Sequence, residues 1–125
     1  AEMYLIEAEA KAWMGDATAS QALFTLISNR NPAYVKSTAT GQTLVNEIYL
    51  HRRLELWGEG FRFYDLKRTN SALNRVGPTT VPATTSNHIS SVALEFNIPA
   101  GDKRWQWLFP RAEINANPAI VQNPN

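Results

Sequence analysis

Five charged residues stand close together in the middle of the chain, and their types could support chemistry. They are Arg52, Glu55, Glu59, Arg62 and Asp65. On a helical wheel that starts at Val45, Arg52 and Glu59 fall on the apolar face, and Glu55 lies at its margin. A buried charge without a partner is strongly unfavourable. The spacing therefore predicts an internal ion-pair network, in which guanidinium groups bind carboxylates.

The same carboxylates allow a catalytic interpretation. Glycoside hydrolases use two carboxyl groups, one as general acid and one as base or nucleophile, and Glu55 and Glu59 are the candidate pair. The neighbouring arginines favour ionised carboxylates, whereas a general acid has to remain protonated. The residues thus favour a structural network, and the hydrolase is kept as an alternative.

Two tryptophans near the C-terminal end are candidates for contact with a ligand. Trp105, Trp107 and Phe109 alternate along the chain, which predicts a short strand with both indoles on one face. Indoles arranged in this way can stack on sugar rings, although large aromatic residues more often serve burial. Trp105 and Trp107 are the candidate ligand-binding residues.

Sites for metals, phosphates and redox chemistry lack the residues that they need. Cysteine is absent, which excludes a disulfide framework, thiolate ligands and a cysteine nucleophile. His51 and His88 are the two histidines and have no second ligand at helical spacing. The segment Gly58-Glu59-Gly60 lacks the strand and the lysine of a phosphate-binding loop. We expect no metal and no cofactor.

Charge and hydropathy exclude two further classes of protein. Twelve Lys and Arg against eleven Asp and Glu give a net charge of +1 over 125 residues, unlike the strongly basic surface of a nucleic-acid-binding module. The longest unbroken apolar run, Met3 to Ile6, is far shorter than the roughly 20 residues of a membrane helix. Ala1 already falls inside a helical pattern, so we expect the chain to be an internal or C-terminal piece of a longer protein.

Three helices have to position the charged cluster. An apolar stripe predicts the first, which ends at Gly15, and it consists of Met3, Ile6, Ala10 and Trp13. Asp16 is a candidate N-cap for the second, which ends near Asn31-Pro32. The resulting hairpin over residues 1–32 resembles one tetratricopeptide unit, and such a unit must stack on neighbours to bury both faces. A third helix over Thr43–Trp57 and a short helix over Phe61–Arg68 form the motif region at residues 43–68.

The remaining part of the chain, residues 69–125, is rich in loop signals. Residues 76–94 carry no charged side chain, and Val92, Leu94 and Phe96 alternate as in a short strand. Together with the alternating tryptophans they suggest a short β-ribbon, and the proline-containing tail from Pro110 suggests ordered coil. The predicted fold class is mainly α, with a helical hairpin, a further helix and this loop-rich portion.

Three blocks of sequence, in order, resemble the C-terminal region of the SusD/RagB family. The central block, IYLHRRLELWGEGFRFYDLKR, carries the arginine-rich helix, E-L, E-G-x-R and D-L of that family, at Arg52, Glu55, Leu56, Glu59, Gly60, Arg62, Asp65 and Leu66. The opening MYLIEAEAKAWMGD is similar to its Tyr-Leu helix, and the ending FPRAEINANPAIVQNPN to its closing pattern. His51 and Phe61 depart from the usual residues, and residues 69–104 have no clear counterpart.

This resemblance implies that residues 1–125 are the C-terminal portion of a SusD/RagB-like domain with tetratricopeptide-like hairpins. It implies a non-catalytic, surface-exposed protein of the outer membrane of Bacteroidetes, anchored by an N-terminal lipid outside this segment. The implied function is to bind nutrient, oligosaccharide first and peptide second, for uptake through a TonB-dependent transporter. Two alternatives remain open, the glycoside hydrolase and a helical adaptor that binds a peptide at the hairpin of residues 2–31.

Overall fold

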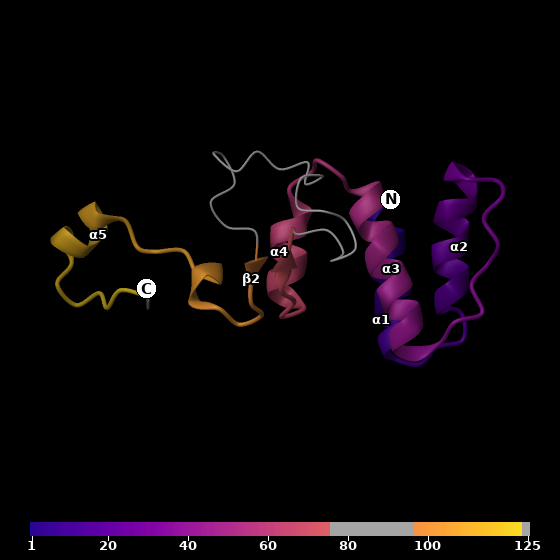
Figure 1. Cartoon of the computed structure of the whole chain (residues 1–125), viewed down its shortest axis with the longest axis horizontal. Coiled ribbons are helices and arrows are strands. Elements are labelled where there is room, and N and C mark those ends of the chain that lie inside the picture. Colours follow the sequence, from indigo (N-terminus) through magenta and orange to yellow (C-terminus); the bar gives the residue numbers. More distant parts are fainter. Residues whose placement is uncertain (76–96, 124–125) are drawn as a thin grey trace, which may run out of the picture. The chain divides into compact units, whose positions relative to one another are not determined.

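The computed structural model describes residues 1–75 and 97–123, which belong to two compact units, residues 1–62 and 63–125. Helices dominate the described residues, so the predicted mainly α fold class is confirmed (Figure 1). In chain order the elements are α1 (Glu2–Trp13), α2 (Ala19–Arg30), α3 (Gly41–Glu55), α4 (Phe61–Arg68), β1 (Leu73–Asn74), β2 (Asn97–Ile98), the 3₁₀-helix η2 (Lys103–Trp105) and α5 (Arg111–Ala116).

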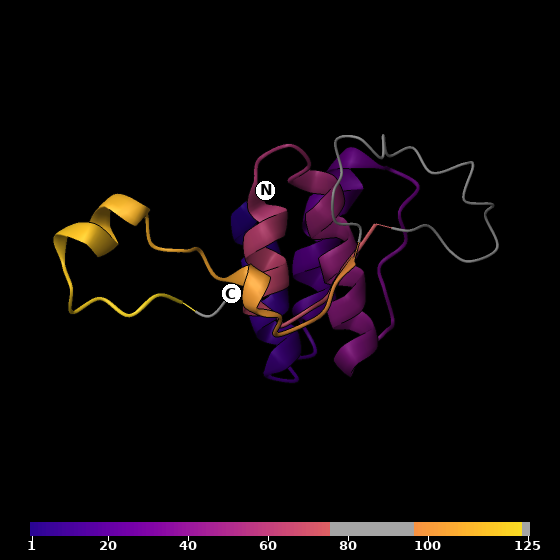
Figure 2. The ribbon, with the colours of Figure 1, turned by 60° about the vertical axis from the view of Figure 1, so that its left-hand side comes forward.

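The first unit is built from α1, α2 and α3, which pack side by side (Figure 2). Its largest fully buried side chains are Leu5, Leu23, Val45 and Ile48, so each of the three helices contributes to one core. Gly15 ends α1 with a φ of 71°, and the amide of Asp16 donates to the carbonyl of Lys11. This is the glycine-containing helix end that lets the chain reverse into the predicted hairpin.

The predicted inward face of α1 was wrong. The structure buries Leu5, Ala8 and Ala12, whereas Met3 and Trp13 of the expected stripe are exposed. The helix carries apolar residues on two faces, and the one with two alanines allows α2 and α3 to approach closely. The bulkier stripe therefore lies on the outer surface of this unit.

The motif region at residues 43–68 divides into α3 and α4 close to the expected positions. Helix α3 begins two residues before Thr43 and ends at Glu55. Gly58 and Gly60 follow with φ values of 81° and 80°, a left-handed conformation that stops the helix. The short helix predicted over Phe61–Arg68 is confirmed as α4.

The second unit has little regular structure among its described residues. Strands β1 and β2 pair antiparallel, with Leu73 opposite Ile98, so the loop-rich portion contains a short β-ribbon, but its strands are not the two alternating segments from which it was predicted. The expected strand through Trp105, Trp107 and Phe109 was wrong, because Trp105 lies in η2. The expected strand at residues 92–96 falls outside the described residues.

The tail beyond Pro110 was expected to be coil, but it contains the six-residue helix α5, which buries none of its side chains. The side-chain amide of Gln122 makes two hydrogen bonds to the backbone of Phe109. Its Nε2 donates to the carbonyl oxygen at 3.1 Å, and its Oε1 accepts from the N–H at 2.9 Å. This pair of bonds closes the loop that holds α5.

Within residues 1–75 and 97–123, no helix has both the length and the apolar character needed to cross a bilayer.

Candidate ligand-binding site

The C-terminal end of α4 forms one wall of a pocket in the second unit. The helix ends with Asn70 in the left-handed conformation at φ 49°. The amide of Ser71 donates to the carbonyl of Leu66 at 2.8 Å, and the amide of Asn70 to that of Lys67 at 3.2 Å. This is the Schellman pattern of helix termination, and asparagine is among the few residues that tolerate its left-handed position. The helix end therefore fixes Leu66, Lys67 and Asn70 relative to one another.

The opposite wall consists of a turn followed by η2. The amide of Asp102 donates to the carbonyl of Pro99, and Gly101 has a φ of 69° at the position of this turn that favours glycine. The same carbonyl accepts the indole N–H of Trp105 at 2.8 Å. Pro99 thus joins the turn to the tryptophan ring, which is only 7% exposed.

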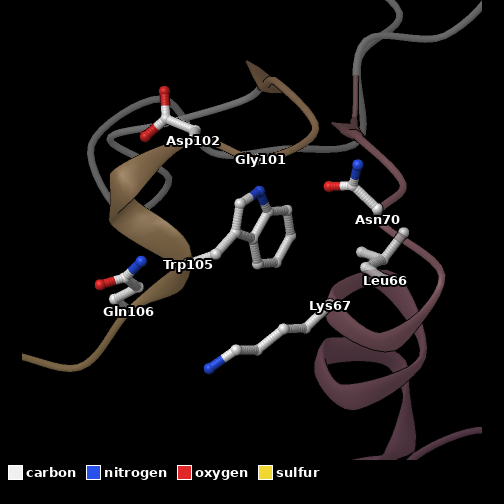
Figure 3. Close-up of a pocket in the computed structure, with 7 residues that line it drawn as sticks. All are labelled: Leu66, Lys67, Asn70, Gly101, Asp102, Trp105 and Gln106. Carbon is white, nitrogen blue, oxygen red and sulfur yellow. The ribbon is translucent and has the colours of Figure 1, made fainter.

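Between these walls lies a pocket of about 160 Å³ (Figure 3). The indole of Trp105 stands in its middle, and the side chain of Asn70 lies opposite. The full lining consists of Leu66, Lys67, Asn70, Gly101, Asp102, Trp105 and Gln106. An apolar ring surface bordered by amide and charged groups is the usual composition of a site for small polar ligands.

The carboxylate of Asp102 is held by Arg104. Its Oδ1 accepts from the Arg104 amide and from Nε at 2.8 Å, and its Oδ2 accepts from Nη2 at 2.9 Å. These hydrogen bonds from Arg104 lower the pKa of Asp102 from 3.8 to about 2. The carboxylate is therefore ionised at neutral pH, and its charge is balanced by a neighbouring guanidinium group.

An aromatic cluster, defined here as Phe63, Tyr64, Trp105 and Trp107, contributes to the same unit. The ring centroid of Phe63 lies 5.5 Å from that of Tyr64, 5.7 Å from that of Trp105 and 6.1 Å from that of Trp107. Trp107 is 75% exposed and Tyr64 is also exposed. Phe63 thus supports one exposed indole and one exposed phenol, an arrangement that can offer ring faces to a ligand.

The two tryptophans predicted for ligand contact therefore have different positions. Trp105 lines the pocket and is buried, whereas Trp107 is exposed and does not line it. Their rings come together around Phe63 and not on one face of a strand. Their role in ligand contact stays a prediction.

Sequence reasoning missed the residues that complete the pocket. Asn70 follows Lys67 and Arg68, and a basic last turn followed by asparagine is a signal for a helix end. The run from Pro99 to Asp102 has the proline, glycine and aspartate of a tight turn. Both signals were present in the sequence, but neither indicates that the two segments meet.

The predicted ion network also includes partners from outside the predicted set. Arg52 is buried, and its Nη2 lies 3.3 Å from Oε1 of Glu2. Arg30 donates from Nε and Nη2 to Oε1 of Glu55, at 2.9 and 2.6 Å. The guanidinium carbon of Arg52 also lies 5.4 Å from the ring centroid of Phe61, within range of a cation–π interaction.

The other members of the predicted network lie around α4. Asp65 is buried, and its Oδ1 accepts from Nε of Arg68 at 2.9 Å. Arg62 is exposed on α4, and Glu59 is exposed in the turn before it. The helical wheel placed Glu59 on the apolar face, but α3 ends at Glu55 before the chain reaches it. A single network of all five residues stays a prediction.

The histidines give no indication of a metal site. The ring of His51 packs edge-on against Tyr34 with the centroids 5.3 Å apart, and His88 falls outside the described residues. No group of three or more His, Cys, Asp or Glu side chains suited to a metal ion occurs in the described part of the chain.

Comparison with known proteins identifies relatives that are much longer than this chain. SusD-like protein P38 of Formosa agariphila is 34% identical over 87 residues, which are 62% of this chain and 17% of that protein. The crystal structure of a Bacteroides vulgatus protein inferred to bind sugar superposes with a TM-score of 0.78 at 27% identity. That match covers 97% of this chain and 26% of the other. The model of the SusD family matches residues 1–125, and the chain therefore belongs to the SusD family.

Proposed function

We propose that this chain forms part of a non-catalytic nutrient-binding protein that captures oligosaccharide for uptake through a TonB-dependent transporter. The family match over residues 1–125 carries this proposal. Proteins of the SusD family are outer-membrane lipoproteins that generally work with such transporters and bind glycans. The likeness to a Bacteroides vulgatus protein inferred to bind sugar supports the same ligand class. In this proposal the protein is exposed at the cell surface and held by an N-terminal lipid outside the segment described.

The aromatic cluster is the proposed contact surface for the oligosaccharide. Trp107 presents an exposed indole that is supported from behind by Phe63. A ring fixed in this way loses little conformational freedom when a sugar stacks on it, which favours binding. Trp105 contributes by closing the pocket next to Phe63.

Binding of oligosaccharides to the wild-type chain and to Trp107→Ala, measured by isothermal titration calorimetry, tests the proposal. We expect Trp107→Ala to weaken binding about tenfold, as for loss of a central aromatic contact. Trp57→Ala is the matched control, because Trp57 is 86% exposed and lies in the other unit. Equal affinities of both variants and wild type would contradict the proposed contact, and absence of binding to any oligosaccharide would contradict the ligand class.

The glycoside hydrolase alternative makes a separate prediction. It requires Glu55 and Glu59 to act on one sugar bond, yet Glu55 is engaged by Arg30 through two hydrogen bonds. Neither glutamate lines the 160 Å³ pocket. We expect no release of reducing ends when the chain is incubated with the oligosaccharides that it binds, and release that Glu55→Gln abolishes would establish the hydrolase instead.

A peptide-binding adaptor is the second candidate function, and one observation favours it. The stripe of Met3, Ile6 and Trp13 on α1 is exposed, and an apolar helix face can receive an amphipathic partner. Binding of a peptide library that Trp13→Ala weakens, without any binding of oligosaccharide, would favour this function over the first.

A further inference from the structure

Lys67 is the one cationic residue that lines the pocket between α4 and η2. Its ammonium group has no hydrogen bond or ion pair with any residue in 1–75 or 97–123. In Figure 3 its side chain runs beneath the indole of Trp105 and ends on the side of Gln106. The pocket therefore has an available positive charge next to an apolar ring.

The carboxylates that could neutralise this charge have other partners. Both oxygens of Asp102 accept hydrogen bonds from Arg104, and Asp65 on the same helix as Lys67 accepts one from Arg68. A guanidinium group that binds a carboxylate through two nitrogens holds it in a fixed geometry. Lys67 is thus the charge in this pocket that a ligand can satisfy.

The remaining lining groups suit a sugar ring. The indole of Trp105 and the side chain of Leu66, which are 7% and 2% exposed, form the apolar floor of the pocket, while the amides of Asn70 and Gln106 offer donors and acceptors. At about 160 Å³ the pocket is smaller than the roughly 300 Å³ at which pockets for drug-sized ligands begin. The volume fits one ring and not a chain of several.

Resting on the proposed function, we propose that this pocket binds a sugar ring that carries an anionic group, a carboxylate or a sulfate ester, and that Lys67 binds that group. A neutral sugar would use the amides and the indole but would leave the ammonium group without a counter-charge. A small inorganic anion would use Lys67 but has no hydroxyl group to donate to the amide oxygens of Asn70 and Gln106. An anionic sugar satisfies both parts of the lining.

Nuclear magnetic resonance of the ¹⁵N-labelled chain provides the test, because the indole N–H of Trp105 reports on the pocket itself. Its signal is assigned by its loss in Trp105→Phe. The probes are methyl glucuronide, glucose 6-sulfate, methyl glucoside and inorganic sulfate. We expect the two anionic sugars to shift the Trp105 indole signal and the backbone amides of Asn70 and Gln106, with at least fivefold higher affinity than methyl glucoside or sulfate, in line with the strength of charge-assisted hydrogen bonds.

Variants separate the role of Lys67 from general charge. Lys67→Gln is expected to weaken binding of the anionic sugars about tenfold and to leave methyl glucoside unchanged. Lys103→Gln is the matched control, because Lys103 is an exposed cation of η2 that does not line the pocket. Circular dichroism of each variant establishes that it is folded.

Three results would overturn the inference. Equal affinity for methyl glucuronide and methyl glucoside would leave a neutral sugar site and keep the proposed function. Equal affinity for sulfate and the anionic sugars would make the pocket an anion site without sugar recognition. Absence of any shift at Trp105 with all three sugars would remove the pocket as a site, while oligosaccharide binding that depends on Trp107 would still support the proposed function.

Discussion

Replacement of Arg52 by alanine should destabilise the first unit far more than the same replacement at Arg53. The two arginines are neighbours on α3, but Arg52 is buried and Arg53 is exposed. The pair therefore compares a buried and an exposed guanidinium with the same local helix propensity. Arg52→Met adds a third variant, which removes the charge and retains most of the apolar stem.

The expected magnitude follows from the burial and the ion pair of Arg52. Its side chain is 7% exposed, so the two methylene groups that alanine lacks, Cγ and Cδ, lie out of water and contribute about 1.6 kcal/mol at roughly 0.8 kcal/mol each. The pair with Glu2 spans 3.3 Å, and Glu2 is 34% exposed, so we assign it about 1 kcal/mol, the upper range for partly hydrated pairs. The total loss for Arg52→Ala is about 3 kcal/mol, and that for Arg52→Met is about 1 kcal/mol.

These differences in the free energy of unfolding are measured by thermal and urea denaturation, with the helical circular dichroism signal as the readout. About 3 kcal/mol corresponds to a decrease in Tm of about 12 °C for a chain of this length. Arg53→Ala is expected to change the free energy of unfolding by less than about 0.5 kcal/mol. If Arg52→Ala and Arg53→Ala unfolded at the same urea concentration, the structural role of Arg52 would be refuted.

Three further perturbations test other parts of the structure. Ile48→Ala, in the fully buried core, should lower the free energy of unfolding in urea by about 2–5 kcal/mol, whereas Val35→Ala on the surface should lower it by less than about 0.5 kcal/mol. Similar losses for the two variants would contradict the placement of Ile48 in the core. Gly15→Ala should lower stability by about 1 kcal/mol through strain at φ 71°, and Gly15→Asn should lower Tm less. Asp102 should titrate near pH 2 by carboxyl carbon resonance, and its pKa should rise after Arg104→Gln, which removes the guanidinium group but keeps the hydrogen bond from the backbone N–H of residue 104. Because the folded-state pKa is the lower one, its contribution to stability is present above about pH 4 and is lost as the pH falls through about 2; equal titration in both proteins would argue against the Arg104 contact.

Helix ends were predictable because the signals that set them are local. Gly15 has a left-handed conformation that few other residues adopt, and Pro32 cannot continue the backbone ladder of α2. Each of these constraints acts within a few residues of the chain. The sequence therefore predicted α1, α4 and the end of α2 closely, but the predicted N-cap of α2 was wrong, because that position is Thr18 and not Asp16.

The partners of the charged residues in their ion pairs were not predictable, because these pairs join segments that are distant in the sequence. Arg52 and Glu2 are 50 positions apart, and Arg30 and Glu55 are 25 apart. Both pairs form only once α1, α2 and α3 have packed together. A helical wheel of α3 alone can show that Arg52 points inward, but it cannot identify Glu2 as the residue that pairs with it.

The alternation of aromatic residues at Trp105 and Trp107 predicted the wrong element for a related reason. The carboxylate of Asp102 accepts a hydrogen bond from the backbone N–H of Arg104 and so caps a helical turn. The indole N–H of Trp105 donates to the carbonyl oxygen of Pro99. These two hydrogen bonds favour η2 over an extended strand. Side-chain hydrogen bonds to backbone groups compete with regular pairing in this way.

The two hydrogen bonds between Gln122 and Phe109 have a consequence for how the tail exchanges its amide protons with water. A six-residue helix with no buried side chain is not stable by itself, so α5 depends on the closed loop around it. The side-chain amide of Asn123 also donates to the carbonyl of Trp107, so the segment from Arg111 to Ala116 loses its constraint when the Gln122 and Asn123 bonds break together. Deuterium exchange in α5 should therefore proceed as one cooperative opening event, with a rate set by the contacts of two neighbouring side chains, Gln122 and Asn123.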